Sequence, residues 1–231
     1  MLSDIIKSML KNVIFSGGVA HDYPKTTSML VEILAEVGIQ SEVQEGFEMA
    51  EDGRILDLDL ITLNCVRWST NQTECFHLSE KARAGLLEFL SRGKGLLALH
   101  CATICFDDWP EYRKILGAWW KWNHSGHAPH QEQKMRVFQG KHPITEGLAD
   151  FVIADELYTD PIITDTVDPL IEGEWYARKH PILWVGQYGP ARICYNALGH
   201  GPEAFANPTN RILLQRGALW VAKQLDAETQ R

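Results

Sequence analysis

Residues 93–109, GKGLLALHCATICFDDW, are the stretch that decides the fold. Two glycines precede four apolar residues at positions 96–99, and the run ends abruptly at the polar pair His100 and Cys101. A short apolar run bounded by glycine is typical of a strand buried on both faces of a parallel sheet. Open α/β sheets bind their ligands just beyond the carboxyl ends of such strands. We therefore expect His100 to lie at the functional edge of the molecule.

The remaining elements are predicted to surround this strand in an α/β order. Strands are expected over residues 12–16, 41–44 and 58–64, with helices over 28–37 and 79–91. Thr26 or Thr27 is expected to cap the first helix, and Ser79 the second. Because helical patterns separate the strands, the order favours a doubly wound, mostly parallel sheet.

The second half of the chain has a less regular pattern. Further helices are expected over residues 109–116 and 209–225, and further strands over 134–138, 169–176, 182–185 and 192–195. We find no internal repeat and no linker, so residues 1–231 are expected to form a single domain. The apolar face of the last helix, with Trp220, packs either inside the domain or against a second subunit, and a homo-oligomer stays open.

Composition excludes several classes of protein. The 231 residues are 45% hydrophobic and 23% charged, as in an ordinary soluble protein. A formal net charge of −8 argues against a nucleic-acid binder, which normally carries a basic face. Neither a signal peptide nor an apolar run of the roughly 20 residues that span a membrane is evident. The five cysteines form no CxxC pair, so we expect reduced thiols in a cytoplasmic protein.

Histidines mark the places where strands should end. His21 follows the first predicted strand, His100 the fourth and His200 the last. In a doubly wound sheet the first two converge, whereas the direction of the last strand is open. A lone histidine is usually structural, but several at strand ends indicate a site.

A second group of histidines lies in the loop WWKWNHSGHAPH, at positions 119–130. His124, His127 and His130 have the i, i+3, i+6 spacing that a metal site can use. Gly126 and Pro129 break any helix here, so the spacing guarantees no common face and matches no recognised ligand signature. The loop also carries tryptophans, whose faces stack on sugar rings or simply pack.

Two other candidates were weighed. Asp155 and Glu156 form an acidic pair at a predicted element boundary, which is either a solvated turn or a source of a catalytic carboxylate. Cys101 stands where a nucleophile elbow would place its nucleophile. The small residues that normally flank such a nucleophile are missing, and no His-x-Glu pair follows, so a catalytic cysteine is not expected.

Taken in order, these motifs resemble the ThuA-like (trehalose utilisation) family of the class I glutamine amidotransferase-like superfamily. The likeness spans nearly the whole chain and rests on short motifs, namely Gly17-Gly18 with His21-Asp22, residues 93–100, Tyr112 with Leu116-Gly117, His124, residues 142–145 with Gly147-Leu148, residues 155–158, residues 181–184 and Gly199-His200. The resemblance implies a flavodoxin-like three-layer sandwich without the amidotransferase triad. It also implies a role in disaccharide catabolism and, for some relatives, hydrolysis of 3-keto-glycosides. Cys101 and the histidine-rich loop depart from the pattern expected of the family.

The resulting hypothesis is acid–base chemistry on a 3-keto-disaccharide or glycoside. Glu156 and His200 are assigned to proton transfer without choosing which is the base. His21, His100 and His124 are expected to stabilise the enolate, directly or through a divalent metal ion. Substrate-binding roles are expected for four further residues, Tyr158, Trp109, Trp122 and Asp22.

Two alternatives remain at this point. One is a metal-dependent isomerase or hydrolase of an unoxidised sugar, and the other is a non-catalytic sugar-binding accessory protein. In each case the expected partner is a small carbohydrate, with neither nucleic acid nor membrane. The cofactor stays open, with a divalent metal ion as the one candidate.

Overall fold

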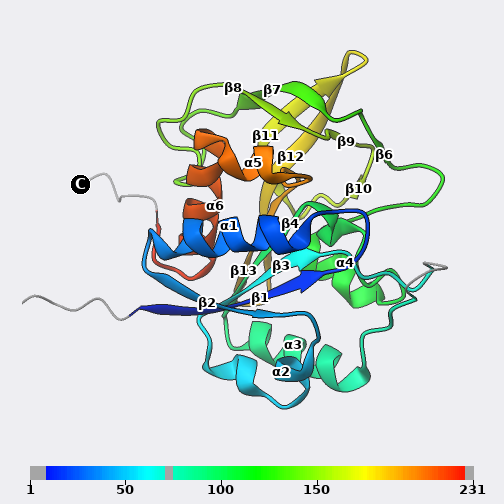
Figure 1. Cartoon of the computed structure of the whole chain (residues 1–231), viewed down its shortest axis with the longest axis vertical. Coiled ribbons are helices and arrows are strands. Elements are labelled where there is room, and N and C mark those ends of the chain that lie inside the picture. The colour runs from blue at the N-terminus through cyan, green and yellow to red at the C-terminus, as the bar shows by residue number, and fades with distance from the viewer. Residues whose placement is uncertain (1–8, 71–74, 227–231) are drawn as a thin grey trace, which may run out of the picture.

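The computed structural model describes residues 9–70 and 75–226, and its centre is a nine-stranded sheet (Figure 1). Five strands form a parallel part with the spatial order β2 (Ile39–Gln44), β1 (Leu10–Gly17), β3 (Leu60–Cys65), β4 (Gly95–Leu99) and β13 (Ala191–Asn196). Four more strands continue the sheet as an antiparallel part, in the order β12 (Arg178–Tyr188), β11 (Asp168–Trp175), β7 (Gln131–Val137) and β8 (Phe151–Asp155). The sheet belongs to the predicted α/β class, with an antiparallel extension.

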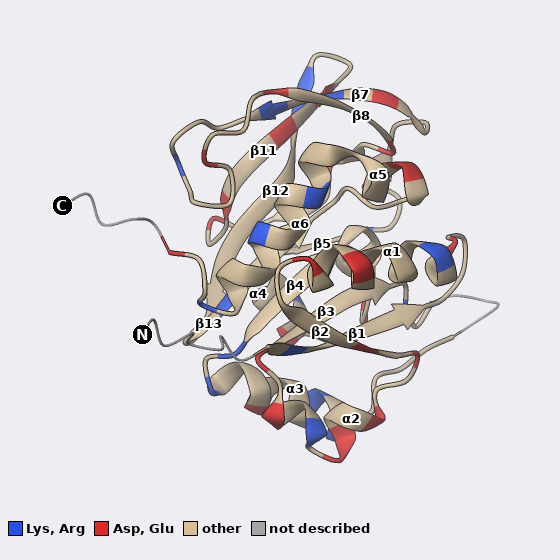
Figure 2. Cartoon of the chain, turned by 60° about the vertical axis from the view of Figure 1, so that its left-hand side comes forward, with Lys and Arg blue, Asp and Glu red and all other residues tan. Residues whose placement is uncertain are grey.

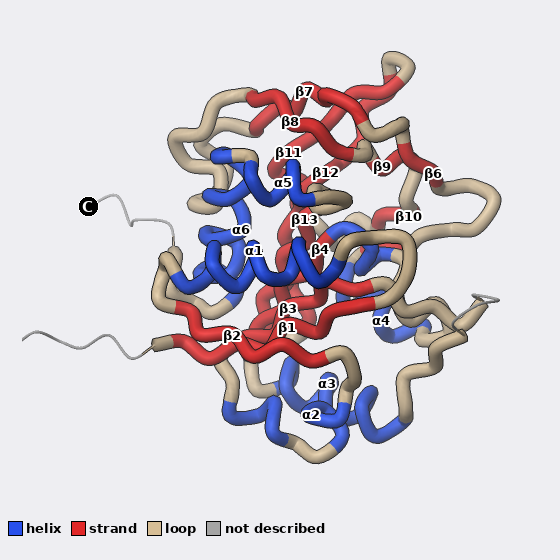
Figure 3. Tube along the Cα trace, in the orientation of Figure 1, coloured by secondary structure: helices blue, strands red, loops and turns tan. Residues whose placement is uncertain are grey.

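Helices cover the parallel part on both faces (Figures 1 and 3). On one face lie α1 (Tyr23–Ala35), α5 (Pro202–Ala206) and α6 (Pro208–Val221), and on the other lie α2 (Glu48–Glu51) and α3 (Glu80–Ser91). The helix α4 (Pro110–Leu116) contacts β12 and β13. Two short 3₁₀ helices, η1 (Arg54–Asp57) and η2 (His100–Thr103), follow α2 and β4. The three-layer arrangement matches the flavodoxin-like sandwich that the resemblance implies.

The remaining strands are two-residue pairs. They are β5 (Ala118–Trp119) with β10 (Ile162–Ile163), and β6 (Gly126–His127) with β9 (Tyr158–Thr159). These antiparallel pairs connect the long loop after α4 to the segment that follows β8. Among the described residues, no helix is long and apolar enough to cross a membrane.

Burial follows from the sequence of each part. Every residue of β3 and β4 is buried and neither strand contains a charged residue, whereas on the outer layer α3 carries charges of both signs and α2 carries acidic ones (Figure 2). Strand β7 instead alternates buried and exposed residues, as a sheet with one solvated face requires. At Gly95, a Cβ atom would lie 2.2 Å from the Val221 carbonyl oxygen, so glycine permits α6 to pack closely.

The sequence placed the first helix wrongly. It begins at Tyr23 instead of residue 28, and its cap is Asp22, whose Oδ1 accepts the Lys25 N–H at 3.2 Å. Pro24 is compatible with this start, since the first turn of a helix requires no N–H donor from it. Strand β8 and the short helices α2 and α5 were not predicted, because each is too short to show a period.

Candidate metal and acid–base site

Three histidines and one glutamate meet at one edge of the sheet. His21 follows β1, His100 follows β4 and His200 follows β13, and the parallel pairing of β4 with β13 places the last two at the same edge. Glu156 follows β8, in the antiparallel part. One side-chain donor atom from each of the four residues lies within 4.8 Å of the others, close enough to share one metal ion.

His100 is buried and its tautomer is fixed. Its side chain is only 3% exposed, and its backbone has a φ of +42° at the start of η2. The Nδ1 atom lies 2.6 Å from the Ala197 carbonyl oxygen, which only accepts, so Nδ1 carries the proton. Burial, with His21 nearby, lowers the pKa of His100 to about 3. The neutral ring therefore presents an Nε2 lone pair to the site.

His21 faces His100 in the same way. Its Nδ1 lies 3.2 Å from the Val19 carbonyl oxygen, which favours a proton on Nδ1, and burial lowers the pKa of His21. Its Nε2 lies 3.1 Å from Nε2 of His100. Two neutral rings with this tautomer would point lone pairs at each other, an arrangement that a shared proton or metal ion stabilises. Backbone carbonyls that orient ligating histidines in this way are usual in metal sites.

Glu156 is surrounded by imidazoles. Its Oε2 lies 3.2 Å from His200 Nδ1 and 3.8 Å from His100 Nε2, and its Oε1 lies 3.3 Å from His127 Nδ1. Burial raises the pKa of Glu156, but His200 and the other imidazoles outweigh burial and lower it overall. The Glu156 carboxylate in turn raises the pKa of His200.

The contact between His200 and Glu156 is electrostatic, because its geometry is not that of a hydrogen bond. His200 Nδ1 is a buried nitrogen without a hydrogen-bond partner among the described residues. A buried polar atom normally has a partner. An unpaired nitrogen beside a carboxylate and two imidazoles fits a site that receives an ion or a substrate oxygen.

Asp155 ties the two parts of the sheet together beneath the site. Its Oδ1 accepts the N–H groups of Glu156 and His200 at 2.8 and 3.1 Å, and its Oδ2 accepts the N–H of Gly199 at 2.7 Å. Burial raises the pKa of Asp155 to about 7, although these three N–H groups oppose the shift. This carboxylate fixes the relative positions of Glu156 and His200, and its contacts were not foreseen from the sequence.

His124 lies outside the cluster that was predicted to include it. It occupies an exposed turn, and its neighbour in the loop, His127, contacts Glu156 instead. The β6–β9 pair places His127 opposite Tyr158. The spacing of its three histidines identified this loop as a candidate. Because the loop has no periodicity, the sequence could not indicate which of the three rings reaches the cluster.

Cys101 and Tyr158 pack behind the histidines. The Cys101 Sγ lies 3.3 Å from the Tyr158 hydroxyl oxygen and 3.5 Å from His21 Nε2, and burial raises the pKa of Cys101 to about 12. A buried thiol with a raised pKa is a poor nucleophile. The Tyr158 ring stacks beside His100, with centroids 4.5 Å apart.

The other three predicted substrate-binding residues are separated in space. Trp109 is buried, 6% exposed, and stacks on Tyr112, so it is a core residue. Trp122 is 45% exposed. Asp22 lines a cleft of ≈ 640 Å³ beside the cluster, whose other lining residues are Ala20, His21, His130, His200, Gly201, Pro202 and Glu203.

A larger hollow of ≈ 830 Å³ lies elsewhere, over the outward face of β7, β8 and β11. Its lining consists mainly of strand side chains that face solvent, such as Lys134, Val152 and Glu174. None of the clustered histidines contributes to it. Size alone therefore does not identify the site, and the smaller cleft beside His21 and His200 adjoins the chemistry.

Comparison with solved structures finds the same fold in other proteins. A putative ThuA-like protein from Parabacteroides merdae has a TM-score of 0.78 at 21% identity, over 96% of this chain and 92% of that one. Another from Bacteroides uniformis has a TM-score of 0.75 at 20% identity, over 96% and 95%. A β-galactosidase from Rahnella sp. R3 matches at 0.58 and 15%, over 81% of this chain but only 28% of its own. At these identities, the likenesses show the fold.

Comparison with curated proteins gave no match. The model of the ThuA family, described as trehalose utilisation, matches residues 11–221. That range includes every residue of the histidine and glutamate cluster. The chain belongs to the ThuA (trehalose utilisation) family.

Proposed function

We propose that this protein hydrolyses a 3-keto-disaccharide or related 3-keto-glycoside, with a divalent cation held between His21 and His100. The observation that carries the proposal is the 3.1 Å approach of two imidazole Nε2 atoms whose Nδ1 atoms both face backbone carbonyls. Glu156 and the unpaired His200 nitrogen adjoin them. The family's link to trehalose utilisation supports a glucosidic disaccharide as the parent sugar.

The reaction follows from the acidity that a ketone gives its neighbours. A base removes the proton from C2 of the keto sugar, and the resulting enolate expels the substituent at C1 as an alcohol once its oxygen gains a proton. Water then adds to C1 of the enone, and a proton returns to C2. The net change is hydrolysis of the glycosidic bond, with no change of oxidation state.

This reaction needs a base, an acid and a group that stabilises the enolate, and the chain offers residues for each. Glu156 is a carboxylate that accepts the C2 proton, and His200, whose Nδ1 lies 3.2 Å from the Glu156 Oε2, supplies the proton to the departing oxygen. The enolate oxygen forms next to His21 and His100, where a cation would offset its charge. We also place this reaction in the cytoplasm, which the five free cysteines support.

The test combines metal analysis with turnover. Purified protein is analysed for bound metal and assayed on 3-keto-trehalose before and after chelation. We expect about one divalent ion per chain and turnover that chelation removes and added metal restores. Wild-type protein that turns over only unoxidised disaccharide would contradict the keto requirement, and metal-independent turnover would contradict the cation.

A matched pair of variants separates the role of Glu156 from that of a simple ligand. Glu156→Gln should abolish turnover while the protein stays folded and retains its metal. Glu174→Gln, on an exposed position of β11, is the control and should behave as wild type. Normal turnover in the Glu156→Gln variant would contradict the assignment, and loss of its metal would make Glu156 a ligand instead of the base.

A further inference from the structure

A line of aromatic rings leads away from the histidine cluster toward solvent. The Tyr158 ring lies 4.5 Å from that of His100, and Trp120 lies 5.1 Å from Tyr158. Trp122 continues the line at 6.4 Å from Trp120, and Trp68 closes it at 5.7 Å from Trp122. We name these four aromatic residues, Tyr158, Trp120, Trp122 and Trp68, the aromatic wall.

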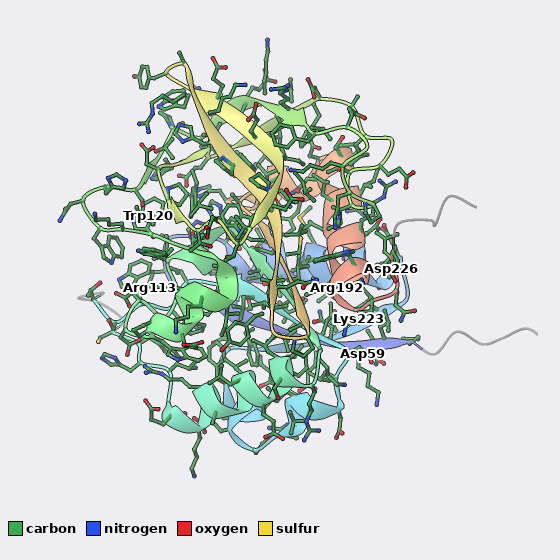
Figure 4. All side chains as sticks on the ribbon, turned by 180° about the vertical axis from the view of Figure 1, so that it is seen from behind. Asp59, Arg113, Trp120, Arg192, Lys223 and Asp226 are labelled. Atoms are coloured by element: carbon green, nitrogen blue, oxygen red, sulfur yellow. The ribbon has the colours of Figure 1, made fainter. Side chains whose placement is uncertain are left out.

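The aromatic wall is fastened to the segment that carries His100. The backbone N–H of Trp120 donates to the Thr103 carbonyl oxygen in η2 at 2.8 Å. Trp68 packs against the small apolar cluster that contains Cys101, the residue after His100. Figure 4 shows Trp120 on the loop between the antiparallel strands and the helix that carries Arg113. These contacts hold Trp120 and Trp68 beside the segment that carries His100.

Trp122 remains exposed within this arrangement. Trp109 shows how an ordinary structural tryptophan behaves here, since it is 6% exposed and stacked on Tyr112. Trp122 is 45% exposed although two other indole rings hold it. A large apolar ring in solvent lacks the hydrophobic free energy that burial would provide. That cost is consistent with a surface that binds something.

Two separate surfaces adjoin the same cluster. The cleft of ≈ 640 Å³ is lined by His21, His200 and polar neighbours and includes no residue of the aromatic wall. The wall begins at Tyr158, which contacts His100 but is only 3% exposed, so its three tryptophans form the face that a ligand can reach. One surface is polar and the other aromatic. Aromatic faces pack well on the C–H faces of pyranose rings, whose hydroxyl groups stay in water.

We propose that the aromatic wall binds the leaving-group sugar of a two-ring substrate, while the polar cleft holds the ring that reacts. This inference rests on the proposed function, since it divides one disaccharide between two surfaces. It makes Trp122 a specificity-determining residue that acts on binding of the second ring. The proton transfers stay with Glu156 and His200.

The test compares substrates with and without a second ring. Steady-state kinetics are measured on 3-keto-trehalose and on methyl 3-keto-glucoside, for wild type and Trp122→Ala. We expect the variant to raise KM for 3-keto-trehalose about tenfold, with kcat unchanged, and to leave the methyl glycoside unaffected. Tyr176→Ala is the control, because Tyr176 is 85% exposed at the β11–β12 turn. Equal KM values for wild type and variant, or equal losses on both substrates, would overturn the subsite.

A binding measurement keeps this inference separate from the proposed function. Calorimetric titration of trehalose and of glucose into the metal-loaded protein requires no turnover. Trehalose should bind more tightly than glucose to wild type, and Trp122→Ala should remove that difference. If wild type turns over neither keto sugar but binds trehalose more tightly than glucose, the proposed reaction is contradicted and the subsite is supported. If trehalose binds no more tightly than glucose, the subsite falls regardless of the chemistry.

Discussion

The parallel and antiparallel parts of the sheet contribute differently to the same site. The parallel part supplies His21, His100 and His200, which follow the carboxyl ends of three strands. Helices cover both faces of this part and bury its strands. The antiparallel part supplies Glu156 and, through β6, His127. A rigid layer thus positions the imidazoles, while a part that is solvated on one face brings the carboxylate to them. We infer that ion binding depends on the first part, whereas proton transfer requires one residue from each part, His200 and Glu156.

Of the changes predicted here, removal of His100 should have the largest effect on metal content and turnover. His100→Ala deletes the Nε2 atom that faces His21 and leaves a cavity in the buried layer. We expect metal to be lost and kcat/KM to fall by roughly 10³-fold or more, as a missing metal ligand would cause. The control His142→Ala removes a histidine that packs on Trp220, far from the cluster, and should retain both metal and activity. Full metal content in the His100→Ala variant would break the proposed division.

The same comparison predicts unequal sensitivity of the two parts to truncation. Leu97→Ala in β4 removes a side chain that is 1% exposed, and we expect the free energy of unfolding to fall by about 2–5 kcal/mol. Val152→Ala in β8 removes one that is 48% exposed, and the expected change is within about 0.5 kcal/mol. Urea unfolding of both variants measures the contrast. Equal losses would mean that β8 contributes to a buried interface of the protein in solution.

The elements of the parallel part are predictable from the sequence because its strands are buried on both faces. A strand buried on both faces appears as a continuous apolar run, and its end is marked where a polar residue such as His100 follows. The convergence of His21 with His100 followed from that topology alone, and the structure brings them to 3.1 Å. The position of His200 could not be predicted, because it depends on the direction of the preceding strand. Only the parallel pairing of β13 with β4 places His200 at the same edge as His100.

In the antiparallel part the sequence carried less information. Strand β8 has five residues and depends on pairing with β7, a contact that no local pattern encodes. The loop that contains His124 and His127 lacks periodicity, so only the two-residue β6–β9 pair decides that His127 and not His124 contacts Glu156. Trp109 shows the converse error, because an aromatic residue near the histidines in sequence proved to be part of the core.

Asp155 offers a direct way to uncouple the two parts. Asp155→Asn replaces one acceptor oxygen with an NH₂ group that would face a backbone N–H. We expect turnover to fall by roughly 10–100-fold, as for other residues that orient ligands, and unfolding free energy to fall by about 1–3 kcal/mol. Asp150→Asn is a matched control, since Asp150 accepts the Val137 N–H at 2.8 Å away from the cluster. In Asp150→Asn the amide oxygen can still accept that N–H, so the control should keep both its stability and its turnover, and a similar loss of turnover in the control would deny Asp155 any special positioning role.

The smallest predicted effects concern Asp22, which has two candidate roles at the edge of the parallel part. Its carboxylate caps α1 and also lines the polar cleft beside His21. Asp22→Ala removes the cap and should lower the free energy of unfolding by about 0.5–2 kcal/mol. Asp22→Asn keeps a capping oxygen but removes the charge, so its stability should equal that of wild type. If the cleft holds the reacting sugar, both variants should raise KM for 3-keto-trehalose and for methyl 3-keto-glucoside alike. Unchanged KM values in the Asn variant would leave Asp22 as a cap alone and move the reacting ring away from this cleft.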